Sequence, residues 1–280
     1  MKSSSFYVAC LASLAVVWSA GCATAPTRTT GVARTPDVIY VPTSPEMVEV
    51  MLKMADVKPG EMVYDLGCGD GRIVVTAARD FGARGIGVDI DPERIRESRQ
   101  NVRDAKVEDR VQIKYADLFE MDFSDADVVA LYLLPALNLR LRPRILDELR
   151  PGTRIVSNSF DMDDWKPDQQ EEDPSTGQSM YFWVVPAKVQ GQWTLALPGG
   201  KTGTLYLVQT FQELTGTVRV DDRTMPLRDL RLRGAKISFT FGDATNLRHA
   251  TAEVAGGRLS GTIRQGEAGP EAPWSGRLTM

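Results

Sequence analysis

Residues 62–72 pass from a short apolar strand, through Asp65, into a turn of the form Gly-x-Gly-x-Gly and on into a helix. A strand that turns sharply and brings its backbone close to a ligand needs residues without a Cβ, which accounts for the glycines. A dinucleotide site would use Gly-x-Gly-x-x-Gly and bind pyrophosphate. The carboxylate of Asp65 would repel pyrophosphate, and it suits an ammonium group instead.

Around this turn, residues 37–186 alternate between strand and helix patterns. We expect helices over 45–55, 72–81, 92–104 and 137–149, and strands over 62–66, 85–90, 111–115, 126–133, 154–159 and 180–185. Strands that alternate with helices imply right-handed crossovers and a mostly parallel sheet. The predicted fold class is α/β, a Rossmann-like sheet with helices on both faces. Ligands on such sheets bind at the carboxyl ends of the strands, at the switch point.

From residue 187 onward the helical spacing disappears. Short alternating segments separated by glycines predict strands near 191–197, 203–210, 216–220, 236–241, 250–254, 259–263 and 274–278. This spacing is typical of a small antiparallel all-β domain, a barrel or a sandwich, which we place over residues 187–280. No catalytic motif occurs there, and five aromatic residues are interpreted as strand core: Trp193, Phe211, Phe239, Phe241 and Trp274.

The first 22 residues have the layout of a secretory signal peptide, with Lys2 ahead of an uncharged apolar run over 6–18. Small residues directly before Cys22 resemble a bacterial lipoprotein box. We therefore predict lipidation of Cys22, a linker over 23–36 and a membrane anchor in a bacterial cell envelope. Ser19 stands where such boxes usually have Leu, so an ordinary signal peptide or an uncleaved anchor stays as the alternative.

Composition excludes several other functions. The formal net charge of -4 gives no broad attraction to nucleic acid, so no nucleic-acid partner is expected. With His249 as the single histidine, a Ser-His-Asp hydrolase and a His-ligated zinc site are both disfavoured, and no metal is expected. If Cys22 is lipidated, Cys68 alone remains in the mature chain, which leaves no internal disulfide.

Three carboxylates close three successive strands of the predicted sheet: Asp65, Asp89 and Asp117. Asp89 lies about 20 residues beyond the glycine turn, where a carboxylate can accept bonds from both ribose hydroxyls. Asp117 would meet the amino group of an adenine. Together they fit one positively charged adenosyl ligand, and S-adenosylmethionine carries an ammonium, a sulfonium and no phosphate. The alternative is that all three are helix caps and turn residues.

Residues 37–186 resemble class I S-adenosylmethionine-dependent methyltransferases. Within that superfamily they are similar to the mitochondrial and prokaryotic protein-lysine methyltransferases that modify the ATP synthase c-subunit and the adenine nucleotide translocase. The features that carry this resemblance are the run Asp-Leu-Gly-Cys-Gly-Asp-Gly-Arg at 65–72 and the segments 40–43, 132–135 and 165–168. The resemblance covers a little over half of the chain.

This resemblance implies S-adenosylmethionine as the cofactor, with its methionine part at the glycine turn, its ribose at Asp89 and its adenine at Asp117. Segment 40–43 would fold over the site. The expected cofactor-binding residues are Tyr40, Thr43, Asp65, Leu66, Gly67, Cys68, Gly69, Asp89, Ile90, Asp117 and Leu118. Cys68 is interpreted as a small loop residue and not as a nucleophile.

The acceptor side is less determined, because the Asn/Asp-Pro-Pro-Tyr motif of amino-methylating enzymes is absent. Methyl transfer is an in-line displacement that needs alignment and a deprotonated nucleophile. Tyr132 is the catalytic candidate, since it could orient an amine or line its channel; packing into the core is the alternative. Trp165 would either form an aromatic wall for a methylammonium or anchor its own loop.

Two functions compete. The first is an S-adenosylmethionine-dependent methyltransferase tethered to the envelope, acting on protein lysine or on a small molecule. The second is a non-catalytic envelope lipoprotein in which the methyltransferase scaffold and the β domain bind a partner. The intact acidic and glycine residues favour the first. The exported location favours the second, because S-adenosylmethionine is made in the cytoplasm; an uncleaved signal would leave the domain on the cytoplasmic face.

Overall fold

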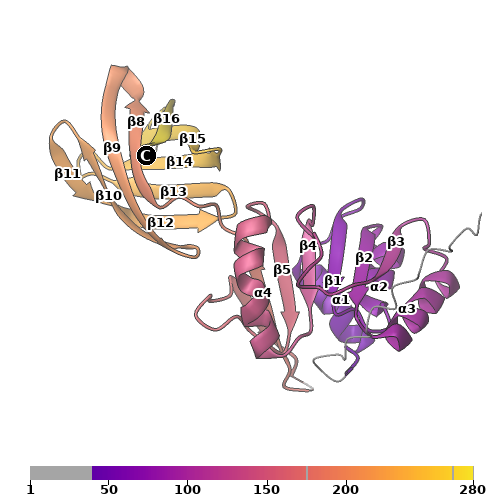
Figure 1. Cartoon of the computed structure of the whole chain (residues 1–280). Coiled ribbons are helices and arrows are strands. Elements are labelled where there is room, and N and C mark those ends of the chain that lie inside the picture. Colours follow the sequence, from indigo (N-terminus) through magenta and orange to yellow (C-terminus); the bar gives the residue numbers. More distant parts are fainter. Residues whose placement is uncertain (1–39, 175, 267, 280) are drawn as a thin grey trace, which may run out of the picture. The chain divides into compact units, whose positions relative to one another are not determined.

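The computed structural model describes residues 40–174, 176–266 and 268–279. The expected signal peptide, Cys22 and the linker lie outside these residues. Within them the chain forms a seven-stranded sheet with helices, followed by a nine-stranded sheet without α-helices (Figure 1). In this part of the chain, no helix combines the length and the apolar character needed to cross a membrane.

The first sheet has the strand order β3-β2-β1-β4-β5-β7-β6. Its strands are β1 (Met62–Leu66), β2 (Arg84–Asp89), β3 (Val111–Tyr115), β4 (Val128–Leu131), β5 (Arg154–Asn158), β6 (Gln169–Glu172) and β7 (Ser179–Val184). β1 to β5 are parallel, and β7 runs antiparallel to both of its neighbours. This confirms the predicted Rossmann-like α/β class. The chain order reverses between β1 and β4, so a crevice is expected at their carboxyl ends.

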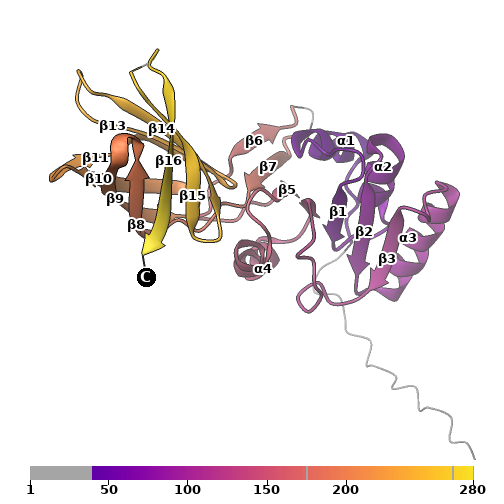
Figure 2. The same cartoon turned by 90° about the horizontal axis from the view of Figure 1, so that it is seen from above.

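Four helices cover this sheet: α1 (Pro45–Met54), α2 (Arg72–Phe81), α3 (Pro92–Asp104) and α4 (Pro135–Glu148). Figure 2 shows α1 and α2 on one side of the sheet and α4 on the other. The helix starts follow from local chemistry, because the side chains of Ser44 and Asp91 accept hydrogen bonds from the first turns of α1 and α3. Proline occupies the first position of both helices, where its missing N–H costs nothing.

β4 lies at the centre of the packing. Val128 and Ala130 pack on the side of α1, whereas Val129 and Leu131 pack on the side of α4, and all four are 0% exposed. Burying a Val or Leu side chain contributes about 1.5–3 kcal/mol to the stability of the fold. Two-sided burial explains the nearly continuous apolar run in the sequence. The strand is nevertheless shorter than the expected 126–133.

The edge strand β6 was not expected from the sequence. Its residues Gln169–Glu172 are all exposed, so no apolar alternation marks it. A second departure is the start of α4, which begins at Pro135 and not at residue 137, because proline is well suited to a first helical position. Both departures lie where hydrophobic periodicity carries no signal.

The second sheet is antiparallel throughout, in the order β11-β10-β9-β8-β16-β15-β14-β13-β12. Its strands are β8 (Gly191–Leu197), β9 (Lys201–Thr210), β10 (Glu213–Val220), β11 (Arg223–Pro226), β12 (Arg228–Arg233), β13 (Lys236–Phe241), β14 (Arg248–Ala255), β15 (Arg258–Gln265) and β16 (Glu271–Thr279), with a 3-10 turn η1 (Pro198–Gly200) after β8. The sequence predicted seven of these strands and missed β11 and β12. β11 has only four residues, and in β12 two leucines, Leu230 and Leu232, stand among charged residues.

The connection between β11 and β12 explains why this sheet curls. These strands stand at opposite ends of the strand order, yet Leu227 alone separates them in the sequence. The two ends of the sheet must therefore approach each other. The Leu227 N–H extends the β10–β11 ladder by one bond, because it donates to Gly216 O across 3.0 Å. The result is a nearly closed, barrel-like sheet, as the all-β prediction anticipated.

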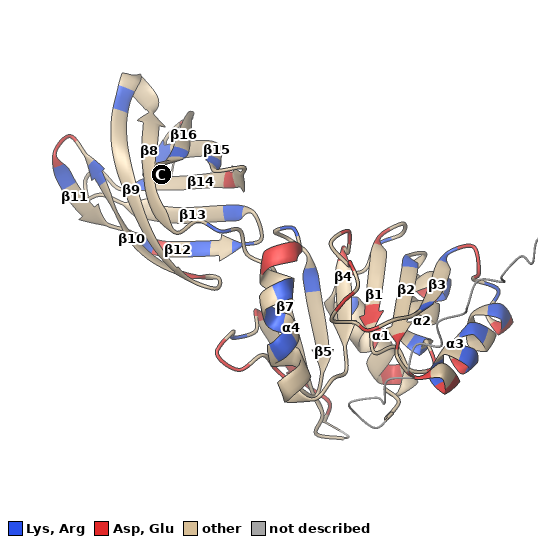
Figure 3. Cartoon of the chain, in the orientation of Figure 1, with Lys and Arg blue, Asp and Glu red and all other residues tan. Residues whose placement is uncertain are grey.

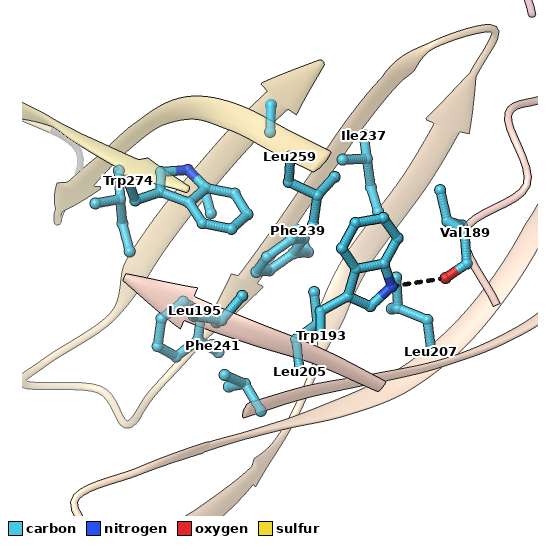
Figure 4. Close-up of a cluster of buried hydrophobic side chains, with 14 of the residues drawn as sticks. Val189, Trp193, Leu195, Leu205, Leu207, Ile237, Phe239, Phe241, Leu259 and Trp274 are labelled. Carbon is cyan, nitrogen blue, oxygen red and sulfur yellow. Dashed lines mark hydrogen bonds between the residues drawn. The ribbon is translucent and has the colours of Figure 1, made fainter. Parts of the chain in front are cut away.

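Side chains of the β domain fill the inside of this sheet (Figure 4). Trp193 is 0% exposed, and its indole Nε1 donates to Val189 O across 2.9 Å. Phe239 packs edge-on against Trp274, with ring centroids 5.7 Å apart. Trp193, Phe239, Phe241 and Trp274 were expected to form the core, and they occupy the space that a larger barrel would offer to a ligand. The expectation was wrong for Phe211, which is only partly buried and is not part of this core.

Candidate active site

A pocket opens at the carboxyl ends of β1, β2 and β4. It is lined by segment 40–43, the turn after β1, residues 88–91 and 116–119, and residues near the start of α4. Ten of the expected site residues line it: Tyr40, Thr43, Asp65, Gly67, Cys68, Asp89, Ile90, Asp117, Leu118 and Tyr132. Two do not. The Leu66 side chain is buried in the core, and Gly69 lies beneath the ring of Tyr40.

Asp65 is the most unusual group of the pocket. Its carboxylate is almost fully buried, and within the described residues its Oδ2 has no hydrogen-bond partner. Burial raises the pKa of Asp65 to about 8, and the nearby charges of Asp89 and Asp70 add to the shift. A buried carboxylate without a partner is costly, and a cation placed beside Oδ2 would remove much of that cost. Asp65 therefore fits the predicted role of holding a positively charged ligand group.

The glycine turn has a shape that other residues would not fit. Gly67 and Gly69 have φ values of 91° and 52°, in the left-handed region. A Cβ on Gly67 would lie 2.9 Å from the Leu133 side chain, and one on Gly69 would lie 2.2 Å from the Tyr40 ring. The N–H groups of Gly67 and Cys68 both donate to Val88 O, which ties the turn to β2.

Asp89 ends β2 with both carboxylate oxygens held by the backbone. Its Oδ2 accepts from Gly69 N at 2.8 Å, and its Oδ1 accepts from Asp91 N at 2.9 Å. A carboxylate oxygen can accept two bonds, so each oxygen keeps capacity for a ligand hydroxyl. Asp117 is fixed in a similar way, since its Oδ1 accepts from Phe119 N at 2.9 Å.

Segment 40–43 is fastened over the glycine turn. Arg72 binds the Asp70 carboxylate through Nε and Nη2 and donates Nη1 to Thr43 O across 2.6 Å. The Arg94 guanidinium lies 4.7 Å from the centre of the Tyr40 ring, a cation–π contact. Burial and the Asp70 carboxylate raise the pKa of the Tyr40 hydroxyl. This segment lines one side of the pocket, as the family resemblance implied.

The opposite side of the pocket is apolar and aromatic. Tyr132 follows β4 and stacks on Phe160, with ring centroids 6.2 Å apart and an interplanar angle of 24°. Leu133 and Leu137 extend this wall.

Two further residues do not take part in the chemistry. Burial raises the pKa of the Cys68 thiol, which keeps it protonated and inert as a nucleophile. Trp165 is 0% exposed and packs against Trp183, so the structure supports the loop-anchor alternative for Trp165.

Sequence reasoning missed several lining residues, namely Asp70, Arg72, Arg94, Phe119, Leu133 and Leu137. Arg72 belongs to the run at residues 65–72, and an arginine two residues after Asp70 could have indicated an ion pair at the pocket. Arg94 and Leu137 reach the pocket from the first turns of α3 and α4. The first turn of a helix that follows a strand of this sheet faces the same crevice, which could have indicated them.

Comparison with known proteins identifies the family. Residues 65–169 match the ANTKMT methyltransferase domain. A protein-lysine N-methyltransferase of Saccharolobus islandicus is 43% identical over 153 residues, which cover 54% of this chain and 95% of that protein. The chain belongs to this methyltransferase family. It is an S-adenosylmethionine-dependent methyltransferase, which favours the enzyme over the non-catalytic scaffold.

Other relatives fit this assignment. The human lysine N-methyltransferase named for the ATP synthase c-subunit is 30% identical over 46% of this chain, and the mouse adenine nucleotide translocase lysine N-methyltransferase is 34% identical over 46%. The chain spans about half of the length of these two proteins. A solved structure described as an RNA methyltransferase from Salinibacter ruber, in complex with S-adenosylhomocysteine, is 47% identical, covers 53% of this chain and 96% of its own, and has a TM-score of 0.52.

The residues present fit S-adenosylmethionine. The unpartnered Oδ2 of Asp65 offers a buried carboxyl group that a cationic cofactor would favour in its ionised form, and the missing Cβ atoms of Gly67 and Gly69 let Leu133 and Tyr40 pack directly against the turn. Asp89 offers carboxylate oxygens to ribose hydroxyls. The individual roles of the cofactor-binding residues remain predictions.

Proposed function

We propose that this methyltransferase transfers the methyl group to the side-chain amine of a protein lysine. The observation that carries this proposal is the chemistry of the pocket wall around Tyr132. The charged lining residues belong to segment 65–72, the β2–α3 turn and Asp117, whereas Tyr132, Leu133 and Leu137 are uncharged. An apolar wall disfavours the ammonium form of an amine, and only the neutral amine can attack.

Within this proposal each part of the pocket has a task. Asp65 balances the positive charge of the cofactor, Asp89 holds its ribose and Asp117 its adenine. The bound cofactor supplies a methyl group activated by a sulfonium. Segment 40–43, fastened by Arg72, excludes water from one side. Tyr132 orients the amine, whose proton leaves to solvent before attack, so alignment contributes more than a strong base.

The Saccharolobus relative supports a lysine acceptor, because nearly its whole length is matched. The Salinibacter structure raises RNA as the competing acceptor. Charge argues against RNA: residues 40–186 contain 18 Lys and Arg against 28 Asp and Glu (Figure 3). Binding to a polyanion depends on neutralising phosphates with basic side chains, which a net negative domain does poorly.

The experiment is to incubate the purified chain with S-adenosylmethionine carrying a labelled methyl group and an extract of the source cells, and then to treat the products with protease or ribonuclease. Labelled methyl-lysine after acid hydrolysis of the protein fraction is expected. The variant Tyr132→Phe should lower incorporation, and Asp80→Ala, an exposed ion-pair residue of α2, should not. Label that ribonuclease removes would overturn the lysine proposal.

We further propose that Cys22 is lipidated and tethers the enzyme to the bacterial envelope. The support is the apolar run over 6–18 followed by small residues before Cys22. Metabolic labelling with a tritiated fatty acid tests this, with Cys22→Ala as the variant and Cys10→Ala as the matched control. Fatty-acid label on the Cys22→Ala variant, or no label on the unmodified chain, would overturn the proposal that Cys22 is lipidated. Protease accessibility in spheroplasts then decides which side of the membrane the enzyme faces.

A further inference from the structure

The turn that follows β5 has an unusual backbone. Ser159 has a φ of 65°, in the left-handed region, although it is not glycine. The Phe160 N–H donates to Asn158 O across 2.8 Å, so three residues close a γ-turn of the positive-φ kind. This turn is rare because it is strained. Strain that persists in a well-packed fold points to a structural requirement at that place.

The strained turn leads directly into Phe160, which packs against a pocket residue. The Phe160 ring stacks on Tyr132, with centroids 6.2 Å apart, a distance at which aromatic pairs attract each other. Tyr132 lines the pocket, and Phe160 stands behind it without lining the pocket itself. The place of the Tyr132 ring therefore depends on the place of Phe160, which in turn depends on the γ-turn.

A buried amide on α4 holds this turn. Asn138 is 0% exposed, and its Nδ2 donates to Phe160 O and Asp161 O, each at 3.2 Å, and more weakly to Ser157 Oγ at 3.4 Å. Ser157 Oγ in turn donates to Phe160 O across 2.6 Å. The Phe160 carbonyl thus accepts from two side chains, which fixes the peptide plane on the far side of the strained residue.

The same amide carries a cost that its structural role does not explain. The Oδ1 of Asn138 is buried and has no hydrogen-bond partner within the described residues. An unsatisfied buried acceptor destabilises a fold, and an apolar residue of similar size would avoid that cost. Asn138 therefore combines a local loss of stability with hydrogen bonds to one strained turn beside the pocket.

From these observations we propose that Asn138 is a positioning residue for methyl transfer, which acts through the γ-turn and Phe160 to hold Tyr132 against the methyl acceptor. Asn138 does not itself line the pocket. Its loss leaves cofactor binding intact and misplaces Tyr132. This inference rests on the proposed function for its kinetic consequence only, because the position of Tyr132 can be measured without any acceptor.

The decisive variant is Asn138→Leu, which keeps the volume and removes both the hydrogen bonds and the unsatisfied oxygen. We expect Tm to stay equal or rise, the Kd for S-adenosylmethionine to stay unchanged, and kcat to fall about 10- to 100-fold, as small misplacements of reacting groups do. Ile145→Val, at a fully buried position two turns along α4, is the matched control, and it should lower Tm slightly without changing kcat.

The acceptor-independent measurement is ¹⁹F NMR of protein labelled with 3-fluorotyrosine, in which Tyr132→Phe identifies the Tyr132 signal. Phe160→Leu removes a stacked ring and should shift that signal. Asn138→Leu should shift it too, and the double variant should match Phe160→Leu alone, since both changes act through one ring. An unmoved signal in Asn138→Leu, or equal kcat for Asn138→Leu and the unmodified enzyme, would overturn the proposal. If lysine is not the acceptor, the proposed function fails on its own assay, and the NMR signal still decides whether Asn138 positions Tyr132.

Discussion

Asp89 accepts a hydrogen bond from the backbone N–H of Gly69 across 2.8 Å, which joins the end of β2 to the turn that follows β1. One carboxylate thereby shapes the glycine turn while its remaining capacity faces the pocket. If Asp89 also binds the ribose, as predicted, cofactor binding and the geometry of the turn are coupled through this side chain.

The variant Asp89→Ala should therefore bind the cofactor more weakly and also lose the geometry of the glycine turn. Gly69 and Asp91 would each keep a backbone N–H without its partner, at a cost of about 1–3 kcal/mol for a buried donor. We expect the Kd for S-adenosylmethionine to rise at least about 100-fold, because ribose hydroxyls lose a charged acceptor as well. Calorimetric titration with the cofactor and with S-adenosylhomocysteine measures this. Micromolar binding by a folded Asp89→Ala protein would contradict the ribose role.

The buried Asp65 predicts an uncommon dependence of stability on pH. Its pKa in the folded protein is raised to about 8 from the ordinary value of 3.8, mainly by burial. Between these values the folded state holds a proton that the unfolded state has lost, so this group's contribution to stability falls as pH rises through the window. The Tm of the cofactor-free protein should therefore drop, relative to Asp65→Asn, between pH 5 and pH 9.

Cofactor addition should reverse that trend, because a cation stabilises ionised Asp65. The rise in Tm on adding S-adenosylmethionine should be larger at pH 8.5 than at pH 6 in the unmodified protein, and nearly independent of pH in Asp65→Asn. Scanning fluorimetry gives both series. A Tm difference between the two proteins that stays constant from pH 5 to 9 would mean that Asp65 is not the titrating group.

Gly69 and Tyr40 form a close pair that a double-mutant cycle can test. An alanine Cβ at position 69 would lie 2.2 Å from the Tyr40 ring, at a φ of 52°. Gly69→Ala should displace segment 40–43 and weaken cofactor binding about tenfold or more, the strain alone costing about 1–2 kcal/mol. Combining it with Tyr40→Ala should be no worse than Gly69→Ala alone, since the clash has gone.

The control for this pair is Gly60→Ala. Gly60 also has a positive φ, of 82°, but a Cβ there would meet nothing within 4 Å. It should reduce stability through strain and leave the Kd unchanged. Additive losses in the Gly69→Ala, Tyr40→Ala pair would show that the tyrosine does not cover the turn.

Substitutions of Trp193 should lower the stability of the β domain by amounts that depend on what is removed. Trp193→Phe keeps most of the buried ring and leaves Val189 O without its indole donor, which should cost about 1–3 kcal/mol. Trp193→Ala removes the ring and should cost about 3–5 kcal/mol. Urea unfolding followed by far-UV circular dichroism ranks the two variants. An alanine variant as stable as the phenylalanine variant would mean that the core collapses around the gap.

The elements that could be predicted from the sequence are those whose buried residues follow a clear apolar pattern. β1, β8 and β13 match the predicted residues, because β1 is an apolar run and the other two alternate around buried side chains. β6 was missed because its Gln and Glu side chains are all exposed, and β11 was missed because Met225 is its single partly buried side chain; both edge strands are held mainly by the backbones of their neighbours. Residue propensity and hydrophobic periodicity do not predict a strand that is defined only by its hydrogen bonds to a neighbouring strand.

The same distinction holds within the pocket. Asp65, Asp89 and Asp117 could be placed from spacing, because parallel strands end at one edge of a sheet. Phe160 and Asn138 could not, since they meet through a strained turn and the side of a helix, 22 residues apart in the chain. Contacts that depend on tertiary packing of irregular backbone leave no periodic trace in the sequence.

The pairing of β8 with β16 determines when the β domain can form during synthesis. Its first and last described strands are hydrogen-bonded partners, so the register from Ser275 to Thr279 against Ala196 to Gln192 cannot form until residue 279 has left the ribosome. The central strands of the methyltransferase sheet pair before that point. Non-local pairing of this kind is slow. A nascent chain interrupted after residue 270 would expose two unpaired edges, β8 and β15, and these are the sites where aggregation would begin.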